Sequence, residues 1–351
     1  MRRVAVIALA LALAPSASAQ QTDSLSQTHA EFMERAYVFK NVPDGKTGEW
    51  FEGLIPLHIP FRQNVQGIYD KVLRDEHRSH ATTSGFFSVV VNLRQTRESS
   101  APVRTPSYMP KLTFTYVNAR RVGAATFPRA MPKSVRLWIV PFVPYGHYSN
   151  GQDGCLFTFQ VETNDVCTDT STVARDTVDA MVNRRDGSFS SHYMQLGVFH
   201  RRVTLDSNFA MGSHLVARRY WSAGVQVRAY QPYYWLGGGM SKELRRQYGP
   251  TRVRVLANRV TQHATGRFFG PGQLRVEGYA EGILGSLNDE VSRVRLSLEL
   301  ARTMDKRSGW GVFVRGYSGQ DDYNLGFMRQ INVIQLGATA SGERMPSFRL
   351  R

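Results

Sequence analysis

An alternation of apolar and polar side chains with a period of two residues is the feature that most constrains the fold. From about residue 84 it recurs in many segments, among them 87–94, 112–116, 221–229 and 293–300. This period is typical of β-strands, whose successive side chains point to opposite faces. One face of each segment is apolar, and the other carries Arg, Gln, Asn or Glu. Transmembrane barrel strands of about 9–11 residues show this division.

A β-sandwich core also produces such alternation. We favour a barrel because the segments are long and rich in aromatic residues, and because no segment of helical period separates them. Ten to twelve segments of this kind can be counted, and no Pro/Ser-rich linker divides the chain. The sequence therefore predicts an all-β fold, a single antiparallel transmembrane β-barrel of about twelve strands.

The N-terminus has the organisation of a secretory signal peptide. A short basic start is followed by an apolar run too short to span a bilayer and by the small residues Ala17-Ser18-Ala19. We expect residues 1–19 to be the signal, 20–80 an N-terminal extension that includes at most the first strand or two, 81–341 the barrel and 342–351 a C-terminal tail. No later apolar run approaches the ~18 residues of a membrane helix.

Charge and cysteine content fit an exported protein in contact with lipid. The formal net charge is +16. This basic excess is explained either by charged loops and strand ends or by attraction to anionic lipid headgroups or lipopolysaccharide phosphates as partners. Nucleic acid is not an expected partner, because no motif for it is present. In an oxidising compartment, the two cysteines predict a disulfide between Cys155 and Cys167. Their spacing does not indicate a zinc site.

The segment 135–151, VRLWIVPFVPYGHYSNG, contains the candidate chemistry. If the strand keeps its register, the odd positions from Val135 through Tyr145 share the lipid-facing side with His147 and Ser149. Residues i and i+2 on one face lie about 7 Å apart at the backbone, a gap that an imidazole and a hydroxyl can close. A serine beside a histidine base is the minimum arrangement for nucleophilic attack on an ester. Pro141 and Pro144 indicate a bulge that would break this register.

Three stretches resemble the outer-membrane phospholipase A family, in the family's order. The first is SSAPVRTPSYMPKL at 99–112, the second is the HxSNG core at 147–151, and the third is GYSGQDDYNLGFMR at 316–329. The resemblance implies a twelve-stranded barrel in the bacterial outer membrane. It also implies calcium-dependent hydrolysis of phospholipid acyl esters and an activity controlled by homodimer formation.

Carried over to this chain, the resemblance makes Ser149 the nucleophile and His147 the general base. The backbone N–H of Ser149 would belong to the oxyanion hole, beside a calcium ion that stabilises the developing charge. The calcium ligands would be Ser99 or Ser100, Ser188 and the backbone carbonyl of Gln152.

The chain departs from the family in three places. The third catalytic residue of the family is an asparagine that orients the histidine, and the best match for its position here is His192. The loop 152–186 is longer than the family's and contains both cysteines. The chain also ends in Phe348-Arg349-Leu350-Arg351, without the usual terminal aromatic residue.

Two other functions remain open from the sequence. A lipid A deacylase also uses a His-x-Ser-Asn core, but its barrel is smaller and its third residue is a glutamate, for which Glu162 is the nearby candidate. A non-enzymatic barrel, such as a pore or a degenerate relative, is the alternative from another class. His192 in place of asparagine is the feature that keeps this last alternative open.

Overall fold

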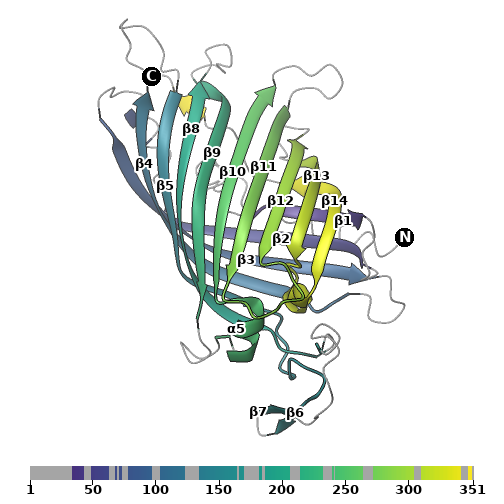
Figure 1. Ribbon diagram of the computed structural model, residues 1–351. Coiled ribbons are helices and arrows are strands. Elements are labelled where there is room, and N and C mark those ends of the chain that lie inside the picture. Colours follow the sequence, from purple (N-terminus) through teal and green to yellow (C-terminus); the bar gives the residue numbers. More distant parts are fainter. Residues whose placement is uncertain are drawn as a thin grey trace, which may run out of the picture.

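Twelve antiparallel strands close into a barrel in the computed structural model (Figure 1). The structure describes residues 34–42, 49–62, 68, 71–72, 78–96, 103–122, 134–163, 166–169, 182–183, 186–205, 214–231, 239–240, 242–263, 272–303, 310–340 and 347–349. The barrel strands are β1 (Ala36–Val42), β2 (Glu49–Arg62), β3 (His80–Thr96), β4 (Ser107–Val122), β5 (Ser134–Ser149), β8 (Ser190–Leu205), β9 (His214–Tyr230), β10 (Thr251–His263), β11 (Gly272–Leu284), β12 (Val294–Thr303), β13 (Trp310–Gln320) and β14 (Gln330–Ala340).

Each barrel strand pairs with its neighbours in the chain, except that β5 pairs with β8 across a long insertion. The pairing of β1 with β14 closes the barrel, so the predicted single antiparallel barrel is confirmed. The barrel begins earlier than the expected boundary at residue 81, because β1 and β2 are full members of the wall. The expected signal at 1–19 lies outside the described residues.

Smaller elements lie at one end of the barrel or beside it. A hairpin of β6 (Gln160–Thr163) and β7 (Val166–Asp169), the helix α5 (Lys242–Tyr248) and the 3-10 helix η2 (Asn324–Met328) lie at the end where β5 finishes (Figure 1). At the other end, β15 (Ser347–Arg349) pairs with the start of β9. Within the described residues, no helix has the length and apolar character needed to cross a membrane.

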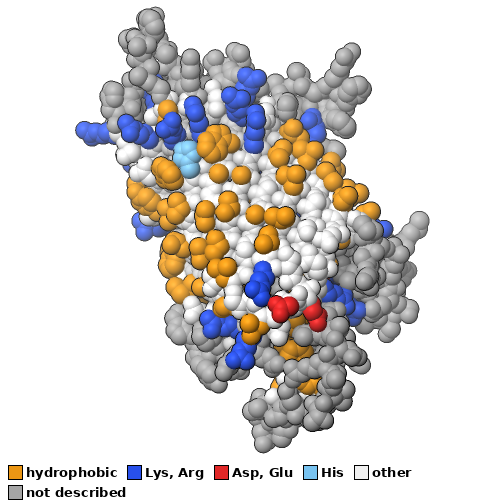
Figure 2. All heavy atoms as spheres, viewed as in Figure 1, with side chains coloured by type: hydrophobic (Ala, Val, Ile, Leu, Met, Phe, Trp, Pro, Cys, Tyr) orange, Lys and Arg blue, Asp and Glu red, His pale blue; other side chains and the backbone are white. Residues whose placement is uncertain are grey.

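The outer wall is apolar, as the alternation predicts. Large hydrophobic side chains are exposed along its strands, for example Phe87, Tyr116, Val225, Leu298 and Leu336. On the face seen in Figure 2, exposed hydrophobic side chains form a band across the wall, with Lys and Arg gathered beyond it at the end opposite α5. An apolar band between two more polar ends is the surface that a bilayer covers.

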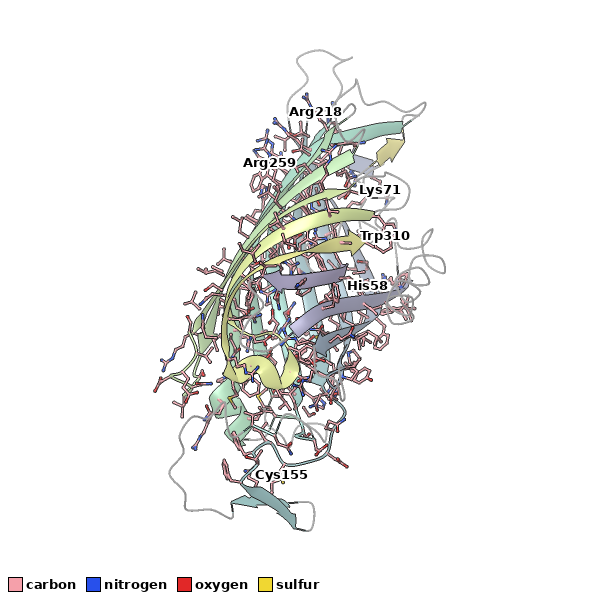
Figure 3. All side chains as sticks on the ribbon, turned by 90° about the vertical axis from the view of Figure 1, so that its right-hand side faces the viewer. His58, Lys71, Cys155, Arg218, Arg259 and Trp310 are labelled. Atoms are coloured by element: carbon pink, nitrogen blue, oxygen red, sulfur yellow. A yellow bond between two sulfur atoms is a disulfide. The ribbon has the colours of Figure 1, made fainter. Side chains whose placement is uncertain are left out.

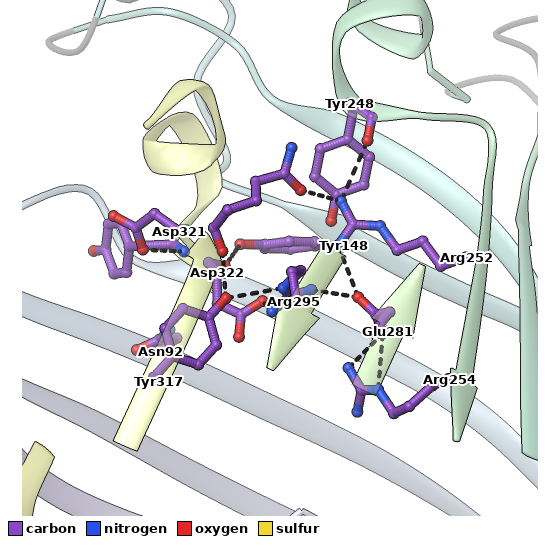
Figure 4. Close-up of polar contacts among 12 residues, drawn as sticks. Asn92, Tyr148, Tyr248, Arg252, Arg254, Glu281, Arg295, Tyr317, Asp321 and Asp322 are labelled. Atoms are coloured by element: carbon purple, nitrogen blue, oxygen red, sulfur yellow. Dashed lines mark hydrogen bonds and ion pairs between the residues drawn. The ribbon is translucent and has the colours of Figure 1, made fainter. Parts of the chain in front are cut away.

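The interior has two different halves. At the end opposite α5, buried apolar side chains fill the lumen, and Ile68 and Val72, from the segment between β2 and β3, pack among them. At the α5 end, side chains from all twelve strands, most of them charged, polar or aromatic, line a cavity of about 290 Å³. Glu281 there forms ion pairs with three arginines, Arg252, Arg254 and Arg295 (Figure 4).

The register of β5 differs from the prediction in its first half. Val135, Leu137, Ile139 and Val143 are buried inside the barrel, whereas Trp138 and its even-numbered neighbours face outward. The pairing with β8 shifts between Val143 and Gly146, at Pro144, where the sequence indicates a bulge. Beyond this shift the odd-numbered residues face outward, because the bulge reverses the alternation. His147 and Ser149 therefore lie on the outward side of the wall, as predicted.

Candidate active site

His147 and Ser149 lie at the end of β5, opposite two residues at the start of β8. His147 is in direct register with His192, and Ser149 is in direct register with Ser190. His192 shares its face with Met194, Leu196 and Val198, of which Leu196 and Val198 are exposed on the outer wall. The two histidines and Ser149 therefore belong to the outward face of the barrel.

The rings of the two histidines are in contact. Their centroids are 4.7 Å apart with an edge-to-face geometry, and His192 is only 5% exposed. A hydrogen bond of 3.1 Å joins Nε2 of His192 and the hydroxyl of Tyr145, whose ring packs on His192. Nδ1 of His147 is buried and has no hydrogen-bond partner among the described residues. The arrangement thus leaves a nitrogen of His147 for a partner within the site.

Asn150 fixes the turn that follows Ser149. It is 1% exposed, and its side-chain NH₂ donates to the carbonyl of Gly187 (2.8 Å). Its side-chain oxygen accepts from the backbone N–H groups of Gln152 (3.3 Å) and Phe189 (2.9 Å). The backbone N–H of Ser188 donates to the carbonyl of Gly154 (2.7 Å). These bonds place Gln152 and Ser188, two of the predicted calcium ligands, in adjacent segments beside Ser149.

Two glycines are required by this geometry. Gly151 has φ = +68°, a conformation that a glycine adopts without a steric penalty, and it turns the chain away from the wall after Asn150. At Gly146 a Cβ would lie 2.3 Å from the ring of Tyr193, which packs against this glycine from β8. The close approach accompanies the bulge that turns His147 outward.

The three sequence stretches that are far apart in the chain meet at this end of the barrel. The hydroxyl of Tyr323 donates to the carbonyl of Thr105 (2.8 Å), and the amide of Asn324 donates to Oγ of Ser107 (3.1 Å). The hydroxyl of Tyr148, between His147 and Ser149, donates to the carbonyl of Asp322 (2.8 Å; Figure 4). The third stretch thereby holds the first beside the HxSNG core.

An ion pair anchors the start of the third stretch. Asp321, which follows β13, accepts two hydrogen bonds from Arg94 (2.6 and 2.8 Å). Burial raises the pKa of Asp321, but the charge and hydrogen bonds of Arg94 outweigh this effect and leave the pKa below its ordinary value. Arg94 also pairs with Glu52 (2.8 Å), so one guanidinium joins two buried carboxylates.

The structure brings only part of the predicted site together. Ser99 and Ser100 lie outside the described residues. Glu162 belongs to β6, in a two-stranded sheet separate from the barrel wall. The predicted disulfide between Cys155 and Cys167 is present and joins the chain before β6 to β7. Among the described residues, no group of three or more His, Cys, Asp or Glu side chains is placed to hold a metal.

Sequence reasoning did not single out Tyr145, Asn150 or Tyr148. Tyr145 has the same parity as His147, so the alternation contained the signal that it shares the outward face. Asn150 and Tyr148 enter the sequence analysis only as members of the HxSNG core. Apart from the contact of Asn150 with Gln152, the hydrogen-bond partners described for these three residues are 37 or more residues away in sequence, which a local pattern does not reveal.

No protein-family model matches the sequence, and no curated protein is significantly similar to it. Among solved structures, outer membrane phospholipase A from Escherichia coli is similar with a TM-score of 0.46 and 11% identity, over 90% of this chain and 98% of that one. A Salmonella typhi outer membrane phospholipase dimer with bound calcium has a TM-score of 0.44 and 11% identity, over 91% and 96% of the two chains. An active-site mutant of the Escherichia coli protein has a TM-score of 0.43 and 12% identity, over 93% and 99%. All three are similarities of fold at low sequence identity.

Proposed function

We propose that the chain is a bacterial outer-membrane phospholipase that hydrolyses acyl esters with Ser149 as nucleophile, His147 as general base and His192 as the residue that positions His147. The observation that supports this most strongly is the His147–His192 contact, next to Ser149, on the outward face of the wall. A site on this face meets molecules that lie in the surrounding bilayer. The substrate class is therefore a phospholipid.

The proposed reaction begins when Oγ of Ser149 attacks the ester carbonyl and His147 takes the hydroxyl proton. His147 then gives this proton to the departing alcohol, which leaves as a lysophospholipid. Water hydrolyses the acyl-serine ester, again with His147 as base. The backbone N–H of Ser149 would donate to the oxyanion that forms on the carbonyl oxygen.

His192 is proposed to replace the asparagine of the family as the positioning residue. A neutral imidazole accepts a hydrogen bond from a neighbouring ring N–H, as an amide oxygen does. The bond between Tyr145 and Nε2 of His192 fixes the orientation of the second ring. With the orientation of His192 fixed, His147 would donate one ring N–H to His192. It would then present its second ring nitrogen, which is unprotonated, to the hydroxyl of Ser149.

Calcium is the proposed cofactor, held by the carbonyl of Gln152 and the hydroxyl of Ser188. Neutral oxygen atoms are ligands that calcium accepts, and the bonds of Asn150 hold both segments together. When bound, the ion would stabilise negative charge on the ester oxygen. Ser99 and Ser100 remain further proposed ligands from the sequence resemblance. A homodimer, in which a second protomer supplies additional oxygen atoms, is part of the same proposal.

The two barrel ends support a definite orientation. The longest connections, 150–189 and 231–250, lie at the site end, and outer-membrane barrels place longer loops outside and short turns in the periplasm. The site would then face the outer leaflet. The apolar filling of the other half of the lumen disfavours the alternative of an open pore.

Hydrolysis of a phospholipid in mixed detergent micelles, with and without calcium, tests the proposal. We expect Ser149→Ala to reduce the rate to the uncatalysed background, whereas Ser318→Ala, a matched change on the outer face of β13, leaves it unchanged. Release of fatty acid from phospholipid but not from lipid A would separate this function from that of a lipid A deacylase. A folded wild-type barrel with no hydrolysis would favour the non-enzymatic alternative.

A further inference from the structure

A row of arginines crosses the outer wall at the end opposite the candidate active site. On neighbouring strands Arg120 is in direct register with Arg136, and Arg136 with Arg202. Arg202 is in register with Trp221 on β9, and Trp221 with Arg259 on β10. All four arginines are exposed, and Figure 3 shows Arg259 on the outer side of the wall.

The row has no negative partner in the described part of the protein. The described ion pairs of the barrel strands involve inward-facing arginines, and none includes Arg120, Arg136, Arg202 or Arg259. Like charges directly opposite each other on adjacent strands destabilise a sheet. Two such contacts side by side, Arg120–Arg136 and Arg136–Arg202, are relieved by an anion bound over this part of the wall, and the described residues supply none.

Aromatic side chains beside the row place it at the level of lipid headgroups. Trp138 and His200 are in register one pair deeper in the wall, with ring centroids 5.0 Å apart. Trp221 packs on His200 at 5.2 Å. Exposed tryptophans mark the boundary between acyl chains and headgroups in membrane barrels. Arg136 and Arg202 lie about 7 Å further along their strands, where the phosphates would be.

The distance to the candidate active site agrees with this placement. From Arg136 to Ser149, β5 extends for about 43 Å at about 3.3 Å per residue. A strand tilted by about 40° covers roughly 33 Å of membrane depth over that length, close to the ~30 Å hydrocarbon thickness. The arginine row and the active site therefore lie at opposite faces of one bilayer.

We infer that this row, with Trp138, His200 and Trp221, is a binding site for anionic phospholipid headgroups of the leaflet opposite the active site. Guanidinium groups bind phosphate oxygens in pairs, and the aromatic rings would pack on the upper acyl chains. The inference rests on insertion of the barrel in a bilayer, but not on hydrolysis. Its occupant is a membrane lipid, rather than free phosphate or a second copy of the chain.

Native mass spectrometry of the purified full chain tests the site. The protein is released from micelles containing equal amounts of phosphatidylglycerol and phosphatidylcholine, and the retained lipids are counted. We expect wild type to retain phosphatidylglycerol preferentially, and Arg136→Gln/Arg202→Gln to lower the relative binding constant about 30-fold, which is about 2 kcal/mol. The single change Arg202→Gln should lower the relative binding constant for phosphatidylglycerol about fivefold. The matched control, Arg293→Gln at the other end of the barrel, should not lower this constant.

A second measurement distinguishes the site from a structural role. In a neutral detergent, Arg202→Gln removes a like-charge contact and should leave the unfolding midpoint unchanged or raise it. In vesicles containing phosphatidylglycerol, the same variant should unfold more easily than wild type. Equal destabilisation in both media, equal protection by inorganic phosphate, or loss of self-association with unchanged lipid retention would each overturn the inference. Hydrolysis by all these variants should stay at the wild-type rate, whether that rate is high or zero.

Discussion

Replacement of His192 is the sharpest test of how His147 is held. His192→Phe keeps an aromatic ring of similar size in a position that is 5% exposed, but it removes both ring nitrogens. The variant therefore loses the hydrogen bond to Tyr145 and any hydrogen bond to His147. His192→Asn restores an amide oxygen at the same position. The pair separates packing from hydrogen bonding.

The size of the effect follows from the hydrogen bond that we propose between the two rings during the reaction. A hydrogen bond to a group that becomes charged is worth about 1.5–3 kcal/mol, and His147 would become cationic when it takes the serine proton. At about 1.4 kcal/mol for each factor of ten, kcat of His192→Phe should fall by about 10- to 100-fold. KM should change little, because His192 is not expected to bind the substrate. His192→Asn should retain the wild-type kcat or exceed it.

The assay is hydrolysis of a micellar phospholipid at saturating calcium, measured from pH 5 to pH 9. The wild-type rate should fall as pH drops through the imidazole range, because protonated His147 is no base and a protonated His192 cannot accept its hydrogen bond. In His192→Asn only His147 contributes to this loss. An unchanged kcat in His192→Phe, or a loss confined to KM, would refute the positioning role. Inactivity of wild type and His192→Asn alike would favour a degenerate barrel.

Three further predictions concern the surroundings of this pair. Chelation of calcium should abolish hydrolysis without unfolding the barrel, and hydrolysis that is insensitive to a chelator would contradict the role of the ion. Ser188→Ala should raise the calcium concentration that gives half of the maximal activity. Gly146→Ala forces the added Cβ against the Tyr193 ring and should lower the unfolding free energy by about 1–3 kcal/mol. The variant should also lose activity, and a stable, active variant would show instead that the ring moves freely. Asp321→Asn should cost about 3 kcal/mol, because it leaves part of the buried Arg94 charge unpaired. Folding lowers the pKa of Asp321, so the stability that its carboxylate contributes is fully present above the ordinary carboxyl pKa range. This stability is lost as pH falls through the pKa of Asp321 in the folded protein. The free energies of unfolding of wild type and variant should therefore converge in acid.

The alternation was sufficient to predict the barrel, because each strand divides its side chains between lipid and lumen. It assigned the outward faces of β3, β4, β9 and β12 correctly. It failed in the first half of β5, where both faces are apolar. Leu137 and Ile139 face an apolar part of the lumen, while Trp138 faces outward, so hydropathy does not distinguish the two sides.

The candidate site was predictable only where its residues are local. The spacing of His147 and Ser149 puts them on one face, and the family resemblance identifies His192 at the start of another strand. Which strands become neighbours is a matter of topology, so the register of His147 with His192 needed the structure. The contacts of Asn150 likewise depend on the packing of segments that no local pattern relates.

Alternation also explains how the lumen stabilises a site on the opposite side of the wall. Tyr148 lies between His147 and Ser149, so the geometry that turns those two outward turns Tyr148 inward. Its side chain is buried and donates to the carbonyl of Asp322. The neighbouring Asp321 is held by Arg94, which Glu52 also binds. The charged interior near this end therefore fixes the strand end from inside, while His147 and Ser149, the proposed catalytic residues, lie on the outer face. The alternation of polar and apolar residues around His147 is what separates these two roles.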